Sequence, residues 1–161
     1  MKETRAMIRP FTESDLHALH RMICHTIEVS YTGVYPPRAV QFFKEHHSEE
    51  KIAGRSAAGH IWVLVSDQDG SILATGALVD AQVIGVFVHP DHRRKGYGKA
   101  IMAELEKMAR AKALPRIALS ISLPSRKFYE HCGYEVLEEC AIDVGAGEHL
   151  KYWTGEKLLP P

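Results

Sequence analysis

The hydrophobic positions in the first third of the chain repeat at helical spacing, after a short apolar segment at residues 7–10 that suits an edge strand. Thr12, followed three residues later by Asp15, marks the start of a helix. One apolar stripe then runs through Leu16, Leu19, Met22, Ile23 and Ile27. We therefore predict a helix at about residues 13–30 and a shorter second helix that follows two prolines and ends near residue 47.

From residue 60 onward the pattern changes to short strands separated by turns. Residues 54–59 are small and polar, which predicts a loop before the first of these strands. The predicted strands share β-branched, aromatic or alternating apolar residues and cover residues 60–66, 72–79, 82–89, 117–122, 134–143 and 149–153. Helical spacing returns at residues 96–113, and a short helix at residues 125–131 stops at Gly133.

The predicted order of elements is β-α-α-β-β-β-α-β-α-β-β, which indicates an α/β chain. Its first half contains a meander of sequential strands, and its second half contains a strand–helix–strand crossover, which implies a locally parallel pair of strands. The chain has 161 residues, and no repeat or interdomain linker interrupts it. We therefore expect one domain over residues 1–161, with a core at about residues 7–153.

Composition narrows the class of protein. Twenty basic and twenty acidic residues cancel, so no overall field favours nucleic acid or a membrane surface as partner. The three cysteines, Cys24, Cys132 and Cys140, form no CxxC pair, which indicates a reducing compartment rather than a disulfide framework or a zinc site. Neither a signal peptide nor an apolar run of about 20 residues is present, so we expect a cytoplasmic protein.

One segment, at residues 86–100, combines a strand, three consecutive cations, two glycines and a helix start. Cations there oppose the helix dipole by ~0.3–1 kcal/mol each, and a bound anion resolves this conflict through free backbone N–H groups. Gly96 and Gly98 would let the backbone approach that anion closely. A solvated basic turn is the alternative. A Walker loop fails because Ala100 follows Lys99, and a dinucleotide fingerprint fails because Ile101 stands where its third glycine belongs.

At this point the chain resembles the GNAT superfamily of acetyl-CoA-dependent N-acetyltransferases. The family's acyl-CoA motif, Val-x-Pro and then Arg/Gln-x-x-Gly-x-Gly/Ala, corresponds to Val88-His89-Pro90 and to residues 93–98. Its second motif, a strand followed by Phe-Tyr-x-x-x-Gly-Phe/Tyr, corresponds to residues 128–134. The resemblance implies a central mixed, mostly antiparallel sheet of about six or seven strands, flanked by about four helices and splayed at the acyl-CoA site.

The resemblance also implies a set of acetyl-CoA contacts. The diphosphate would be held by backbone amides of residues 94–99, and the pantetheine would pair with the end of the strand that precedes them. The implied contacts are Val86, Phe87, Val88, Arg93, Arg94, Lys95, Gly96, Tyr97, Gly98, Lys99, Ser122, Ser125 and Phe128. A backbone N–H of Phe87 or Val88 would polarise the thioester carbonyl. Tyr129 would be the general acid that protonates the leaving thiolate, or else a packing tyrosine.

The sequence departs from the family pattern where a base is expected. The strand at residues 82–88 often carries a carboxylate in this family, but Gln82 and Ile84 hold the inward positions here and neither takes a proton. Asp80 is either a turn residue or a substitute base. Serines also replace the Asn and Ala that often stand near positions 122 and 125.

Other candidate residues carry weaker predictions. Tyr31, Tyr35 and Phe42 fall in the region that shapes the acceptor pocket in this family, with core packing as the alternative, and Gln82 is a further acceptor contact. The run of residues 46–50, His-His-Ser-Glu-Glu, lacks metal-ligand spacing and is predicted to be a polar, frayed helix end. We expect no metal.

The function that follows from the resemblance is transfer of acetyl from acetyl-CoA to a primary amine of a small molecule or peptide, by direct attack in a ternary complex. The alternative is a module that binds or senses acyl-CoA without turnover, to which the missing carboxylate lends weight. A nucleic-acid-binding protein is disfavoured by the zero net charge. The expected assembly is a monomer or a homodimer.

Overall fold

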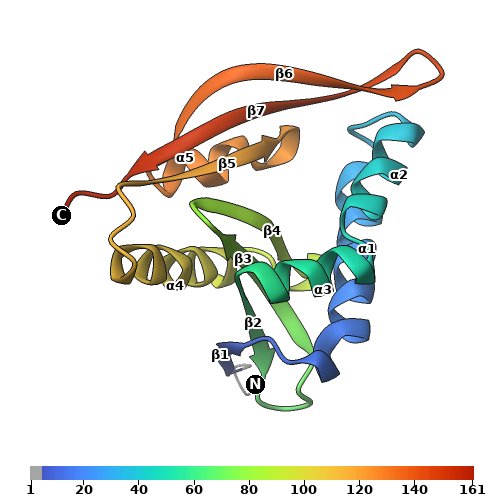
Figure 1. Cartoon of the computed structure of the whole chain (residues 1–161). Coiled ribbons are helices and arrows are strands. Elements are labelled where there is room, and N and C mark those ends of the chain that lie inside the picture. Colours follow the sequence, from blue (N-terminus) through green and yellow to red (C-terminus); the bar gives the residue numbers. More distant parts are fainter. Residues whose placement is uncertain (1–4) are drawn as a thin grey trace.

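The computed structural model describes residues 5–161, which fold around one seven-stranded sheet (Figure 1). Its spatial order is β1-β2-β3-β4-β5-β7-β6. The strands span β1 (Ala6–Pro10), β2 (His60–Ser66), β3 (Ile72–Val79), β4 (Gln82–Val88), β5 (Arg116–Ser122), β6 (Glu135–Gly145) and β7 (Glu148–Leu158). All neighbouring pairs are antiparallel except β4 and β5, which run parallel. The predicted α/β class with a mixed, mostly antiparallel sheet is confirmed.

Helices cover both faces of this sheet. They are α1 (Leu16–Tyr31), α2 (Pro37–His46), α3 (Glu49–Ala58), α4 (Tyr97–Ala111) and α5 (Arg126–His131), with single 3₁₀ turns η1 (Glu13–Asp15), η2 (Pro90–His92) and η3 (Leu123–Ser125). The first three helices pack on one face and bury Val63 of β2, whereas α4 and α5 pack on the other and bury Leu64. Both faces of β3 are therefore covered, which explains why its residues from Ile72 to Leu78 are all buried.

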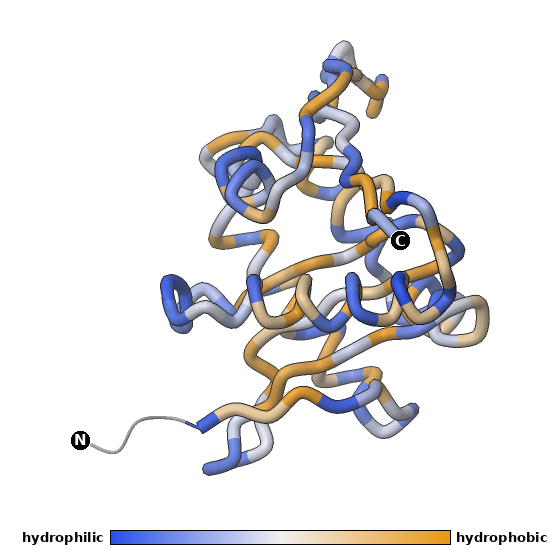
Figure 2. Tube along the Cα trace, turned by 90° about the vertical axis from the view of Figure 1, so that its left-hand side faces the viewer, coloured by the Kyte–Doolittle hydropathy of each residue, from blue (hydrophilic) through white to orange (hydrophobic). Residues whose placement is uncertain are grey.

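Hydropathy along the chain agrees with this layering. Figure 2 shows hydrophobic residues along the interior strands and hydrophilic residues on turns and on the outer sides of helices. Glu106 of α4 departs from the pattern, because it is charged and buried. It accepts a 2.6 Å hydrogen bond from Lys157 Nζ. This bond joins α4 to β7.

The helix α3 corrects the sequence analysis. Residues 54–59 were expected to form a loop and residues 46–50 a frayed helix end, but residues 49–58 are helical. Ser48 accepts a hydrogen bond from the backbone N–H of Lys51 at 3.2 Å and caps the new helix, and Glu49 and Glu50 favour its first turn. Gly54 is exposed in mid-helix with open space around it, so the packing of Ile52 outweighs its weak helix propensity. Residues 5–161 therefore contain five α-helices, one more than the four that the hydrophobic pattern predicted.

The C-terminal hairpin is longer than the sequence predicted. Strands β6 and β7 each have 11 residues, and their turn reaches beyond the sheet to lie against α2 (Figure 1). The base of β7 continues to Leu158, which pairs with Arg116 of β5. Because β7 lies between β5 and β6, the hairpin also forms one wall of the site described next.

Candidate functional site

The site begins at a break in the sheet between β4 and β5. These parallel strands pair only at Gln82 and Ala118 and then separate. A bulge reinforces the break, since Phe87 pairs with Thr75 of β3 but Ile84 pairs with Ala77, which leaves two residues of β4 opposite one. Gly85, at the bulge, has φ +66°, a left-handed conformation that favours glycine. The edge of β4 that faces β5 therefore presents unpaired backbone groups beyond Gln82, which gives the predicted splay.

The basic segment lies directly after β4, where the chain enters α4. Arg94 has φ +62° and Gly96 has φ +81°, so the loop turns sharply before the helix begins at Tyr97. No side chain caps that helix start in the described chain, and the first internal bond is from Ala100 N–H to the carbonyl of Gly96. Backbone N–H groups at the start of α4 thus remain available to an anion.

The cations of this loop are exposed and surround the helix start. Arg93 hydrogen-bonds Ser30 at the end of α1, and Lys95 Nζ lies 3.2 Å from His92 Nδ1. Arg94 and Lys99 project into solvent without an acidic partner in residues 5–161. The helix dipole and these side chains together favour a negative charge at this position.

The two glycines of the segment have different roles. Gly96 has open space around it, whereas a methyl group on Gly98 would lie 3.0 Å from Phe128 Cε1 and 3.2 Å from Val88 Cγ2. Gly98 is therefore the contact through which the first motif packs against the second. Phe128, expected at the acetyl-CoA site, lies in this packing layer beside Tyr129, with 5.1 Å between the ring centres.

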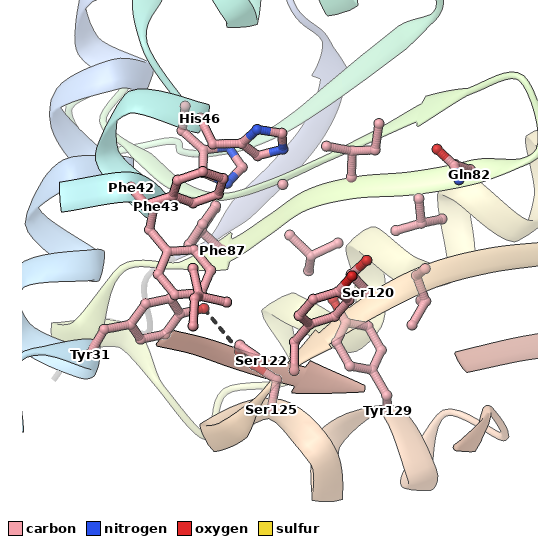
Figure 3. A pocket seen from close by; sticks show the side chains of 18 of the residues that line it. Tyr31, Phe42, Phe43, His46, Gln82, Phe87, Ser120, Ser122, Ser125 and Tyr129 are labelled. Carbon is pink, nitrogen blue, oxygen red and sulfur yellow. Dashed lines mark hydrogen bonds between the residues drawn. The ribbon is translucent and has the colours of Figure 1, made fainter. Parts of the chain in front are cut away.

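A cavity of about 370 Å³ opens between β4 and β5 beneath α1 and α2. Figure 3 shows its two sides: Phe42, Phe43 and His46 of α2 on one, and Ser120, Ser122, Ser125 and Tyr129 on the other. Val86 and Phe87 of β4 line it, while Val88 does not. Tyr152 of β7 contributes a further aromatic wall. The cavity is thus mainly apolar with a few hydroxyl and imidazole groups, a composition typical of small-molecule sites.

Tyr129 of α5 lines this cavity and is only 7% exposed. Burial raises the pKa of its hydroxyl, and the neighbouring Tyr31 and Cys132 raise it further. The hydroxyl therefore carries its proton at neutral pH. Within residues 5–161 it makes no hydrogen bond, which leaves it free to donate to a ligand in the cavity.

Tyr31 and Tyr35, both predicted to contact the acceptor, have different surroundings. Tyr31 lines the cavity, and its hydroxyl donates to Ser122 Oγ at 3.0 Å, the bond drawn in Figure 3. Ser122 Oγ also lies 2.7 Å from Ser125 Oγ. Tyr35 does not line the cavity, because its hydroxyl donates to the carbonyl of Lys151 and accepts from the N–H of Leu123. It braces β7 against η3.

Like β4, the rest of the cavity wall offers no acidic side chain in the described residues. Gln82 and Ile84 both line it, and no carboxylate of residues 5–161 does. Asp80 occupies the turn between β3 and β4 with φ +53° and is exposed outside the cavity, which favours its turn role.

Two histidines of the cavity were missed by the sequence analysis. His46 and His47 both line the cavity, and His47 is 5% exposed with its ring 5.0 Å from that of Phe87. Burial, with smaller contributions from the neighbouring Arg55 and His46, lowers the pKa of His47 to about 2. Two adjacent histidines before a capping serine gave a helix-boundary signal, but nothing local showed that they face β4.

Within residues 5–161, no group of three or more His, Cys, Asp or Glu side chains is arranged to hold a metal ion. No helix of the described part is both long and apolar enough to cross a bilayer.

Comparison with known proteins gives one family. A model of the acetyltransferase (GNAT) family matches residues 20–134, more than half of the chain. This match includes both motifs as far as Tyr134. No curated protein sequence matches the chain at a significant level.

Solved structures agree with the fold. A GCN5-related N-acetyltransferase from Rhodopseudomonas palustris is 20% identical, with a TM-score of 0.85 and 99% of each chain covered. The PaiA N-acetyltransferase of Thermoplasma acidophilum, in complex with coenzyme A, is 18% identical with a TM-score of 0.78, covering 96% of this chain and 99% of its own. The yncA protein of Salmonella typhimurium, solved with its cofactor acetyl-CoA, is 18% identical with a TM-score of 0.69, covering 98% and 96%.

Proposed function

The chain belongs to the acetyltransferase (GNAT) family, and we propose that it transfers the acetyl group of acetyl-CoA to a primary amine by direct attack in a ternary complex. The observation that supports this most is a juxtaposition. The free edge of β4 leads from the cavity that holds the Tyr129 hydroxyl to the uncapped start of α4. Acetyl-CoA consists of a thioester and a diphosphate joined by an extended linker. It therefore needs a cavity, a strand edge and an anion site in this order.

Acetyl-CoA fits this framework through its own chemistry. The diphosphate would accept hydrogen bonds from backbone amides of residues 94–99, with Arg94 and Lys99 neutralising its charge. The pantetheine amides would pair with the unpaired edge of β4 like an added strand. Phe87, at the cavity wall, or Val88 would then direct a backbone N–H at the thioester oxygen.

The reaction is balanced by two proton movements. The amine nitrogen bonds to the acetyl carbonyl carbon, the carbon–sulfur bond breaks, and the thiolate takes a proton from Tyr129, which regains one from the water that receives the proton of the amine. Because the raised pKa of Tyr129 exceeds the ordinary thiol value of about 8.5, the hydroxyl acts first by hydrogen-bonding the sulfur. The amine loses its proton to water, which Gln82 helps to position, since the cavity wall in residues 5–161 has no carboxylate.

A second candidate function is favoured by that same absence. A protein without a base could bind acyl-CoA as a sensor and release no thiol. Thiol release measured with amino acids, polyamines, aminoglycosides and peptide N-termini separates the two functions. We expect release that depends on one class of amine, and an enzyme that binds acetyl-CoA but responds to no amine would be the sensor.

The cellular setting we propose follows from the thiols. Cys24, Cys132 and Cys140 are all free. Free thiols persist in a reducing compartment, and we therefore infer that the enzyme works in the cytoplasm.

A further inference from the structure

The cavity wall in residues 5–161 carries no charge at pH 7. No Asp, Glu, Lys or Arg side chain of the described chain lines it. Burial raises the pKa of the Tyr31, Tyr129 and Tyr152 hydroxyls, so these groups keep their protons. Burial also lowers the pKa of His46 and His47, so both rings are uncharged. A charged group enclosed here would lose its water without gaining a counter-ion, which is costly.

A cation packs behind this neutral wall. Arg55 Nη1 lies 3.0 Å from the position that a methyl group on Gly85 would occupy, and Nη2 donates to the carbonyl of His46 at 2.6 Å. In the described part of the chain, no acidic side chain lies within ion-pair distance of Arg55. A nearby cation and burial both lower the pKa of an amine. The cavity therefore favours a neutral amine over an ammonium ion.

Aromatic rings form the side of the cavity opposite the hydroxyl groups. Phe42 and Phe43 of α2 pack in one cluster with Phe87, the residue beside which the thioester is proposed to bind. Figure 3 shows Phe42 and Phe43 across the cavity from Tyr129. The ring of Tyr31 meets that of Phe43 edge-on, with 4.7 Å between their centres. Such rings pack favourably against a further ring, either offset-stacked or edge to face.

The size of the cavity limits the body of the acceptor. Its volume of about 370 Å³ must hold the acetyl end of the donor as well as the acceptor. An apolar cavity of about 150 Å³ is large enough to bind benzene. The space beside the acetyl group therefore suits one aromatic ring with small substituents.

We propose that the acceptor is an arylamine, a primary amine bonded directly to a single aromatic ring that carries no charged group. This inference rests on the proposed acetyl transfer. The nitrogen lone pair of an arylamine is delocalised into the ring, so the amine is weakly basic and neutral at pH 7. It attacks the thioester carbon without first losing a proton. The proton that nitrogen releases as the carbon–nitrogen bond forms and the carbon–sulfur bond breaks goes to water, as in the proposed reaction.

Other amines fit this cavity less well. Polyamines, aminoglycosides and free amino acids would each bring at least one further charge into a wall that offers it no partner. An alkylamine would have to shed its proton on entry, because its ordinary pKa of ~10.4 keeps it protonated at pH 7.

The test compares aniline, benzylamine and cyclohexylamine as acceptors at pH 7, with the product identified by mass spectrometry. Aniline should have the largest kcat/KM, at least about tenfold above benzylamine, which is aromatic but protonated. Among substituted anilines, 4-aminobenzamide should exceed 4-aminobenzoate at least about tenfold, because only the second brings a charge. Benzylamine, a polyamine or an amino acid used in preference to every arylamine would overturn the inference and leave acetyl transfer intact.

A variant tests whether the missing carboxylate sets this preference. Ile84→Glu places a carboxylate in the cavity wall, where it can pair with an ammonium ion and accept its proton. The benzylamine-to-aniline ratio of kcat/KM should rise at least about tenfold. Leu137→Glu is the control, because Leu137 of β6 is 48% exposed and outside the cavity, and the ratio should not change. If Ile84→Glu does not fold, Gln82→Glu, a nearly isosteric change at an exposed cavity residue, takes its place.

An unchanged ratio in the folded variant would overturn the inference. Calorimetry in the presence of CoA measures the acceptor side without turnover. We expect 4-acetamidobenzamide, the acetylated form of the neutral substrate, to bind at least about tenfold more tightly than 4-acetamidobenzoate. This result would support the arylamine even if no amine is acetylated, which would refute the proposed function alone. Equal affinities, or no binding of either compound, would overturn it.

Discussion

The donor side and the acceptor side of the site are built in opposite ways. The donor side is one continuous segment, in which β4, the basic loop and the start of α4 follow each other within residues 82–99. The acceptor side converges from α1, α2, β5 and β7, and Tyr31 and Ser122, which are bonded at 3.0 Å, lie 91 residues apart. A site made of consecutive backbone has a sequence signature, whereas a wall assembled by tertiary packing has none.

The same contrast applies to charge. The proposed donor side gathers exposed cations around free helix amides, groups that favour an anion and that are visible in the sequence. The cavity in residues 5–161 is lined by neutral groups, and Arg55, which packs behind Gly85 of its wall, comes from a helix that the sequence analysis missed. Donor recognition and acceptor recognition should therefore respond to different substitutions.

The largest effect is expected where the two sides meet. Tyr129→Phe keeps the ring and deletes the hydroxyl that faces the cavity, so kcat should fall ~100-fold while acetyl-CoA affinity is nearly unchanged. Tyr134→Phe is the control, because its buried hydroxyl has no partner in the described chain and lies outside the cavity. A kcat within twofold of wild type in Tyr129→Phe would make this residue a packing tyrosine.

If no side chain acts as the base, the pH profile of kcat/KM should follow the ionisation of the amine substrate. Below the pKa of the free amine, kcat/KM should rise about tenfold per pH unit, because only the neutral amine attacks. The inflection should move when an amine with a pKa of ~10.4 is replaced by an α-amino group at ~7.7–8.0. An inflection fixed near pH 6–7 for all substrates would expose a side-chain base, with His46 as the first candidate in the cavity, because the pKa of His47 is held near 2.

The donor side should be sensitive at the contact between its two motifs. Gly98→Val places a side chain against Phe128 and Val88, so α4 must move away from β4. Acetyl-CoA affinity should fall at least tenfold, about 1.4 kcal/mol, with ~1–3 kcal/mol of stability lost to overpacking. Gly54→Val, at an exposed helical glycine with open space, controls for the substitution itself. Calorimetry on folded protein decides, and unchanged affinity in Gly98→Val would remove the donor-site assignment.

The smallest effect at neutral pH concerns stability and comes from His47. Its pKa is depressed to about 2 when folded, against ~6.5 when unfolded, so below pH 6.5 the unfolded chain binds a proton that the folded chain does not. The free energy of unfolding should therefore be unaffected by this group above pH 6.5 and fall by about 1.4 kcal/mol per pH unit below it. Denaturant titrations should show a shallower acid dependence in His47→Gln, and parallel curves would contradict this burial.

Hydrophobic periodicity and turn residues predicted most of the fold, because most helices and strands are recognisable from their own residues. The crossover, the meander and the sheet class follow from the pattern, and the basic loop after β4 was placed correctly. The helix α3 was missed because Gly54 and the small residues around it weaken the helical signal, although Ser48, Glu49 and Glu50 marked its start. That omission also hid the position of Arg55 beside Gly85 and the inward position of His47, since both depend on how α3 packs on the sheet.

Single-turnover transfer from acetyl-CoA labelled with ¹³C at the acetyl carbonyl tests the central claim most directly. Enzyme in excess over the thioester is mixed with the amine that best stimulates thiol release, and the label is followed by NMR. The account predicts that the label moves from the thioester to an amide of the acceptor, and that Tyr129→Phe slows this movement ~100-fold. Label that stays in the thioester, or that appears as free acetate at the same rate with and without amine, would contradict it.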